Sequence, residues 1–143
     1  GRFDNGLGEL SDAASALDWM QTINPNAKFC WISGFSFGAW IAMQLMMRRP
    51  EILGFISIAP PASKHDFSFL APCPASGMIL HGDKDEVIPQ SSVDKLAQKL
   101  QKQKNIKIDY RIIEGSDHFF LDHLEPLNKQ VNDYLDKMLS KAA

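Results

Sequence analysis

A serine with a glycine two positions away on each side is the sharpest chemical signal in the chain: Gly34-Phe35-Ser36-Phe37-Gly38. A short apolar run at 29–32 precedes it, and a helix is expected over 39–49 directly after it. This pattern predicts a tight strand-to-helix turn with the serine at its apex. Glycine at 34 and at 38 would let the backbone pass where a Cβ would clash. We therefore expect Ser36 to project from the sheet and to act as a nucleophile.

The helix that follows the serine also offers stabilisation for negative charge. The first N–H groups of a helix have no carbonyl partner within it, and its N-terminus carries a partial positive charge. We expect the Phe37 N–H to hold the oxyanion that forms when Ser36 attacks a carbonyl.

A serine hydroxyl needs a base to take its proton, and the chain has four histidines. His118 follows the last predicted strand, which would put it at the same end of the sheet as Ser36. His65 lies in a proline-rich stretch, and His81 ends a strand and is interpreted as structural. His123 stands near the start of the last helix and is expected to point outward. We expect His118 to be the base.

The base needs a carboxylate to fix its tautomer. The stretch after the third predicted strand offers Asp83, Asp85 and Glu86. Chain order favours an acid here, because serine, acid and histidine would then follow successive strands. The residues alone leave open which of the three carboxylates it is.

Strands and helices alternate along the chain, which predicts an α/β fold with a parallel sheet and helices on both faces. The last strand alternates between apolar and polar residues, which is typical of a sheet edge. The stretch 60–76 holds four prolines and is interpreted as a loop. The expected strands are 29–32, 52–58, 78–80 and 106–112, and the expected helices are 10–20, 39–49, 91–104 and 124–138.

Taken together, the motifs resemble the α/β-hydrolase superfamily, and most closely the small bacterial hydrolases related to dienelactone hydrolases and short-chain esterases. The matching stretches are 34–39, 59–61, 81–89 and 115–120. In the family pattern H-G-x-x-D-x-x-x-P the acid stands at the fifth position, which the resemblance assigns to Asp85, leaving Asp83 as a turn residue. The resemblance likewise assigns the histidine of 115–120, His118, as the base.

The resemblance also implies that several strands precede the region where this chain starts. We expect residues 1–143 to form a single α/β-hydrolase domain of about four strands that lacks the family's N-terminal strands, about the C-terminal two-thirds of such an enzyme. The absent part would supply a second oxyanion donor and a partner for the strand at 29–33. An unpaired apolar strand is a template for association, so a homo-oligomer formed through this edge is expected.

The predicted function is a serine hydrolase that cleaves an ester of a small-molecule acyl substrate through an acyl-enzyme. Ser36 would attack, His118 would move the proton and Asp85 would orient His118. No metal and no organic cofactor are implied. A thioester or peptide bond could be cleaved by the same triad, and a catalytically inactive fragment or binding module is a further alternative.

Composition narrows the choice further. The chain is 45% hydrophobic and 22% charged, which is ordinary for a globular protein and excludes a disordered tail. A net charge of −2 argues against nucleic acid as a partner, and no apolar run is long enough to cross a membrane. Cys30 and Cys73 have no metal-binding spacing. Free thiols and the absence of a signal peptide predict a cytoplasmic protein.

Overall fold

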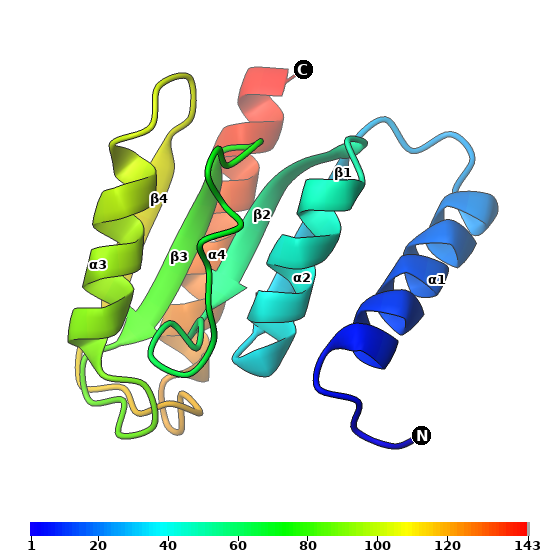
Figure 1. Ribbon diagram of the computed structural model, residues 1–143. Helices are drawn as coiled ribbons and strands as arrows, with labels where there is room; N and C mark the ends of the chain where they lie inside the picture. The colour runs from blue at the N-terminus through cyan, green and yellow to red at the C-terminus, as the bar shows by residue number, and fades with distance from the viewer. Residues whose placement is uncertain (143) are drawn as a thin grey trace.

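A four-stranded parallel sheet forms the centre of the protein in the computed structural model, which describes residues 1–142 (Figure 1). The strands lie side by side in chain order, and each neighbouring pair is parallel. This confirms the predicted α/β fold. The elements are α1 (Leu7–Ile23), β1 (Cys30–Phe35), α2 (Phe37–Arg48), β2 (Ile52–Ile58), β3 (Gly77–Gly82), α3 (Gln90–Gln101), β4 (Ile108–Ile113) and α4 (Leu124–Ala142).

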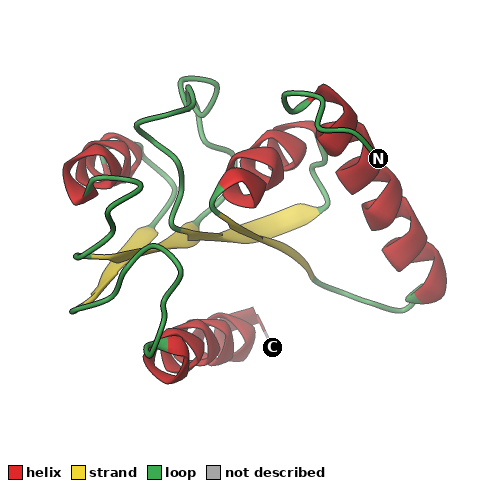
Figure 2. Ribbon diagram, turned by 90° about the horizontal axis from the view of Figure 1, so that it is seen from below, coloured by secondary structure: helices red, strands yellow, loops and turns green. Residues whose placement is uncertain are grey.

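Helices cover both faces of the sheet, as the alternation of elements predicted (Figure 2). On one face lie α2 and α3, with α1 packed against α2, and α4 lies on the other face. Each face has its own cluster of buried side chains: Met43, Phe55 and Leu100 belong to the cluster under α2 and α3, and Met78 and Tyr134 belong to the cluster under α4.

The proline-rich stretch crosses the face that carries α2 and α3, and its side chains complete the core there. Phe67, Leu70 and Cys73 are buried in the α2–α3 cluster. The Gln103 side chain fixes this loop, because its amide nitrogen donates to the Leu70 carbonyl at 2.8 Å and its oxygen accepts the Cys73 N–H at 2.7 Å. The loop therefore has a defined path between the two helices.

The alternation expected in the last strand fails at its end. The alternation puts Ile112 on the same face as Ile108 and Tyr110, yet Ile112 is exposed, and Ile113 is buried instead. Ile113 packs against Phe120 and Tyr134 in the cluster under α4. The strand also begins at Ile108 rather than at residue 106. Asp109 and Arg111 are half-buried, and β4 is an edge strand of the sheet, as the alternation predicted.

No helix within residues 1–142 has both the length and the apolar character that crossing a membrane requires.

Candidate active site

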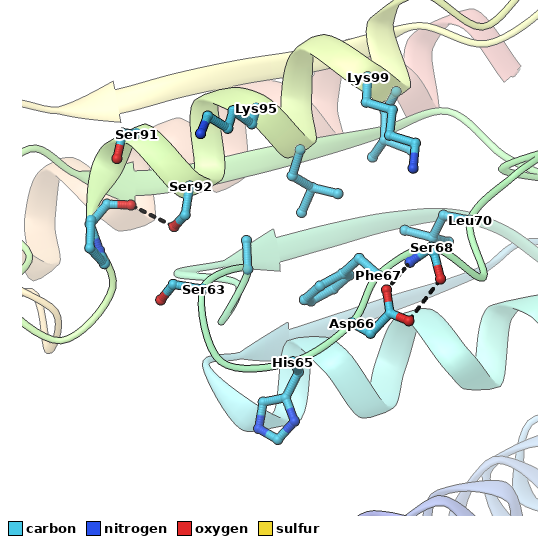
Figure 3. Close-up of a pocket in the computed structure, with 14 residues that line it drawn as sticks. Ser63, His65, Asp66, Phe67, Ser68, Leu70, Ser91, Ser92, Lys95 and Lys99 are labelled. Atoms are coloured by element: carbon cyan, nitrogen blue, oxygen red, sulfur yellow. Dashed lines mark hydrogen bonds between the residues drawn. The ribbon is translucent and has the colours of Figure 1, made fainter.

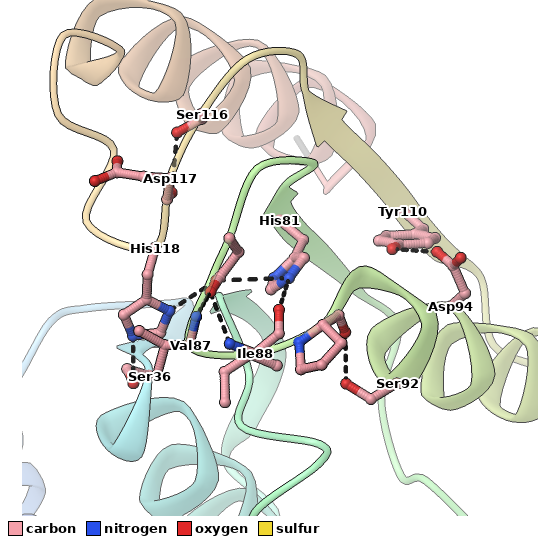
Figure 4. Close-up of polar contacts among 12 residues, drawn as sticks. Ser36, His81, Val87, Ile88, Ser92, Asp94, Tyr110, Ser116, Asp117 and His118 are labelled. Atoms are coloured by element: carbon pink, nitrogen blue, oxygen red, sulfur yellow. Dashed lines mark hydrogen bonds and ion pairs between the residues drawn. The ribbon is translucent and has the colours of Figure 1, made fainter.

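Three side chains from the ends of three different strands meet at the carboxyl edge of the sheet (Figure 4). Ser36 directly follows β1, Asp85 lies in the turn after β3, and His118 lies in the loop after β4. His118 Nε2 is 2.9 Å from Ser36 Oγ, and His118 Nδ1 is 2.7 Å from Asp85 Oδ2. With a neutral imidazole protonated on Nδ1, the serine hydroxyl donates to Nε2 and Nδ1–H donates to the carboxylate. The arrangement can move a proton from the hydroxyl to the ring while the carboxylate holds the ring.

The turn that carries Ser36 has the strained backbone that the sequence predicts. Ser36 has φ +52° and ψ −122°, a conformation that non-glycine residues rarely adopt. The Ser36 N–H donates to the Ile58 carbonyl at 2.8 Å, so β2 holds the turn in place. Helix α2 begins at Phe37, two residues earlier than expected, because the chain turns abruptly at the serine. As the first helical residue, Phe37 has no carbonyl partner for its N–H within the helix.

The two glycines of the motif are not equivalent. A Cβ on Gly34 would overlap the Gly38 carbonyl oxygen and would lie 2.5 Å from the Gly38 carbonyl carbon and 2.7 Å from the Ala39 Cα. A Cβ on Gly38 would meet no atom within 4 Å. The clash expected at position 38 is therefore absent. The close approach is one-sided, because Gly34 faces the backbone of α2 whereas the Cα of Gly38 faces open space.

The Asp85 carboxylate is held by its own turn. Its side chain is fully buried, and Oδ1 accepts the Val87 N–H at 2.8 Å and the Ile88 N–H at 2.7 Å. Because both of these bonds go to Oδ1, Oδ2 is left to accept from His118. The two N–H donors on Oδ1 fix the carboxylate in the orientation in which Oδ2 faces His118.

Asp83 has a different task. Its Oδ1 accepts the Gly115 N–H at 2.7 Å, and the neighbouring Lys84 N–H donates to the Ser116 carbonyl at 2.9 Å. A Cβ on Gly82 would overlap the Ser116 oxygen, so the two loops run in close contact. Asp83 thus ties the loop after β3 to the loop that carries His118, and it makes no bond to that imidazole.

The remaining histidines do not contact Ser36. His65 stacks on Trp40 with ring centroids 4.2 Å apart, and His123 Nδ1 bonds to the nearby Leu121 carbonyl. His81 is fully buried beside Asp85, with Nε2 2.9 Å from the Ile88 carbonyl and 3.5 Å from Asp85 Oδ2. The sequence interpretation treated His81 as a structural strand end and missed this contact. Its fixed distance from Asp85, four residues along the chain, was the available signal.

Aromatic rings surround the imidazole. The ring of Phe35 is centred 5.3 Å from the His118 ring and that of Phe119 5.0 Å from it. Both side chains are open to solvent, with exposures of 42% and 58%. The surface beside the His118 ring is therefore apolar.

Two hollows lie away from these three residues. One, of about 520 Å³, is lined by the loop at 62–70 and by α3, with Lys95 and Lys99 at its rim (Figure 3). The other, of about 550 Å³, lies between the end of α1 and β1. Ser36, Asp85 and His118 line neither of them. Within residues 1–142, no group of three or more His, Cys, Asp or Glu side chains is arranged to hold a metal ion.

Comparison with known proteins shows one family that matches nearly the whole chain. The family model for the dienelactone hydrolase family matches residues 4–141. An uncharacterized protein of Rickettsia prowazekii (strain Madrid E) is 57% identical over 139 residues, which cover 94% of this chain and 58% of that protein.

Solved structures give the same result. A protein of unknown function from Agrobacterium tumefaciens is 56% identical, with a TM-score of 0.95 over 99% of this chain and 65% of that one. An α/β serine hydrolase homologue from Coxiella burnetii is 30% identical, with a TM-score of 0.81 over 94% of this chain and 62% of its own. A lidless α/β serine hydrolase from Xanthomonas campestris is 29% identical, with a TM-score of 0.85 over 96% of this chain and 60% of its own. The chain thus spans about three fifths of the length of these relatives.

Proposed function

Because this chain belongs to the dienelactone hydrolase family, we propose that it is a serine hydrolase that cleaves an ester of a small-molecule acyl group. The observation that carries the proposal is the continuous hydrogen-bonded series from Ser36 through His118 to Asp85, with steps of 2.9 and 2.7 Å. A serine with an aligned base, and a base with an aligned carboxylate, is the arrangement that activates a hydroxyl for acyl transfer.

In the proposed reaction Ser36 Oγ bonds to the carbonyl carbon of the ester while its proton passes to His118 Nε2. The tetrahedral oxyanion collapses, the bond to the leaving alcohol breaks, and His118 gives the proton to the alcohol oxygen. Water then attacks the acyl carbon and gives a proton to His118; the bond from that carbon to Ser36 Oγ breaks, His118 returns the proton to Oγ, and the acid leaves. Asp85 stays ionised throughout and stabilises the imidazolium.

We assign the Phe37 N–H as an oxyanion donor. It stands at the N-terminus of the twelve-residue helix α2, directly after the nucleophile. The helix dipole adds a favourable potential at the same place. Removing one such donor typically costs about 10²–10³ in rate, so a single placed N–H is a large part of catalysis.

The surroundings favour a substrate with an apolar group. Phe35 and Phe119 offer two exposed rings beside His118, and no charged side chain bonds to Ser36 or His118 other than Asp85 among the described residues. Burying an alkyl or aryl group against such rings is favourable by about 25 cal/mol per Å² of apolar surface.

A fluorophosphonate probe tests the nucleophile. We expect the probe to label the protein at Ser36 and the label to vanish in Ser36→Ala. Ser33→Ala is the matched control, since Ser33 is an exposed serine in β1, the strand that leads to Ser36. A wild-type protein that resists labelling would favour the inactive binding module over the enzyme.

Matched pairs test the other two roles. Hydrolysis of a nitrophenyl ester should be lost in His118→Ala and kept in His123→Ala. Asp85→Asn should lower kcat by about 10⁴, as expected for an imidazole in the wrong tautomer. Asp83→Asn should leave kcat nearly unchanged, because an amide oxygen can still accept from Gly115. Comparing the ester with the matching thioester and anilide separates the esterase from a thioesterase or peptidase.

A further inference from the structure

His81 is a buried polar side chain that the proposed reaction does not use. It is 0% exposed at the end of β3. Its Nε2 lies 2.9 Å from the Ile88 carbonyl oxygen, while its Nδ1 has no hydrogen-bond partner among the residues that the structure describes. A carbonyl oxygen can only accept, so Nε2 carries the proton and Nδ1 is bare.

The contact with Ile88 leads directly to the Asp85 carboxylate. The Ile88 carbonyl oxygen accepts the His81 Nε2–H, and the Ile88 N–H donates to Asp85 Oδ1 at 2.7 Å. The His81 Nε2 also lies 3.5 Å from Asp85 Oδ2, the oxygen that holds His118. Both carboxylate oxygens are thus reached from one imidazole, Oδ1 through Ile88 and Oδ2 across a gap of 3.5 Å.

We propose that His81 is a positioning residue that holds the turn 85–88 around the Asp85 carboxylate and thereby sets the orientation of His118. The inference rests on the proposed function, since positioning has value only if His118 acts as a base. Without the Nε2–H the Ile88 carbonyl would be buried and unsatisfied, and the turn would shift to reach water.

The neutral form of His81 suits this role. Burial lowers the pKa of His81, although its bond to Ile88 and the charges of Asp85 and Asp94 act in the other direction. A neutral N–H donates to Ile88 without placing a cation beside Asp85. A cation there would compete with the His118 imidazolium for the same carboxylate.

Three substitutions separate the donor from the bulk of the ring. His81→Met keeps an apolar side chain of similar length without a donor. His81→Gln keeps an amide N–H that reaches the Nε2 position. Ser57→Ala is the control, because Ser57 Oγ is likewise buried with no hydrogen-bond partner among residues 1–142, but lies in β2, which carries none of the three proposed catalytic residues.

We expect His81→Met to lower kcat by about 10²-fold, the loss typical of a catalytic group misplaced by about 1 Å. His81→Gln should stay within about threefold of wild type, and Ser57→Ala should not change kcat. In an Asp85→Asn background His81→Met should cost little more, because residues that act through each other are not additive. If His81→Met lowered kcat by the same factor in the wild-type and the Asp85→Asn backgrounds, the proposal would be overturned, because general destabilisation predicts equal losses.

A second readout does not need turnover. The His118 Nδ1–H, donated to Asp85 at 2.7 Å, should give a downfield proton resonance that Asp85→Asn abolishes. We expect it to exchange faster with water in His81→Met and to persist in His81→Gln. If His81→Met does not fold, His81→Asn replaces it, because its amide is too short to reach Ile88. An unchanged resonance in the variant without the donor refutes the positioning role even if no ester is cleaved. Loss of ester cleavage in wild type with the resonance behaving as expected would refute only the proposed function.

Discussion

Substituting alanine for Gly34 and for Gly38, the two glycines that flank Ser36, should change the free energy of unfolding in opposite directions. In Gly34→Ala the new Cβ overlaps the Gly38 oxygen and lies 2.5 and 2.7 Å from two further backbone atoms of α2. Ordinary carbon contacts are about 3.5–4.0 Å, so the overlap is about 1 Å or more. No side chain can rotate away to relieve it, because every atom met is backbone. The first turn of α2 must move instead.

The expected cost is at the upper end of the range for overpacking, about 3 kcal/mol in the free energy of unfolding. Movement of α2 also displaces the Phe37 N–H from the serine, so kcat should fall by about 10²-fold. Gly38→Ala is the control. Its Cβ meets nothing within 4 Å, and alanine in place of a helical glycine should stabilise by about 0.5–1 kcal/mol.

Urea titration of both variants measures the two free energies, and initial rates with a nitrophenyl ester measure kcat. A Gly34→Ala protein as stable as wild type would refute the reasoning. So would a Gly38→Ala protein that loses as much stability as Gly34→Ala, because the two sites would then be equally crowded.

The remaining predictions concern pH and association. Burial lowers the pKa of His81 in the folded protein, and the ionisable groups near it are Asp85, His118 and Asp94. As the pH falls below about 6.5, the unfolded chain therefore binds a proton at this residue before the folded protein does, and the free energy of unfolding should fall. The fall should be smaller in His81→Gln, which has no imidazole to protonate. Burial raises the pKa of Tyr134 to about 12, so ultraviolet titration of the folded protein should show no tyrosinate from Tyr134 at pH 10–11. The free energy of unfolding should decline above about pH 10, because the unfolded chain loses this proton there. The outer edge of β1 has no strand partner in the described sheet, and we propose that it pairs with the same edge of a second copy. Light scattering should show a dimer, and a monomer at every protein concentration would contradict this proposal.

The broad fold was predictable because its signals are local. Short apolar runs separated by helical patterns specify a parallel sheet, and the helix stop at Asn24 needs only its own neighbours. Side-chain direction was harder. Ile112 and Ile113 are equally apolar, and only the three-dimensional packing, which puts Ile113 in the cluster with Tyr134, distinguishes them.

At the site, the motif pointed to Ser36, and the position after the last strand pointed to His118, but a sequence motif does not show which of its residues are crowded in space. The sequence does not show that a Cβ at position 34 would clash with Gly38, whereas a Cβ at position 38 would meet no atom within 4 Å. Among the carboxylates, residue type could not separate Asp83 from Asp85. The separation is geometric, since one bonds to Gly115 and the other to His118. His81 was missed for a related reason: a lone histidine at a strand end shows its partners only in three dimensions.

Ser36, Asp85 and His118 follow three separate strands, and this has a consequence for the order of events in folding. His118 contacts Ser36 across 82 residues of chain and Asp85 across 33. Closing loops of that length costs entropy that is recovered only when β4 docks on β3, and parallel sheets assemble slowly for this reason. Helices α2 and α3 can form before that step, so helical signal should return early in refolding. The capacity of Ser36 to react with a phosphonate should return later, when the last strand docks. The rate at which this reactivity returns would therefore measure the rate at which the sheet is completed.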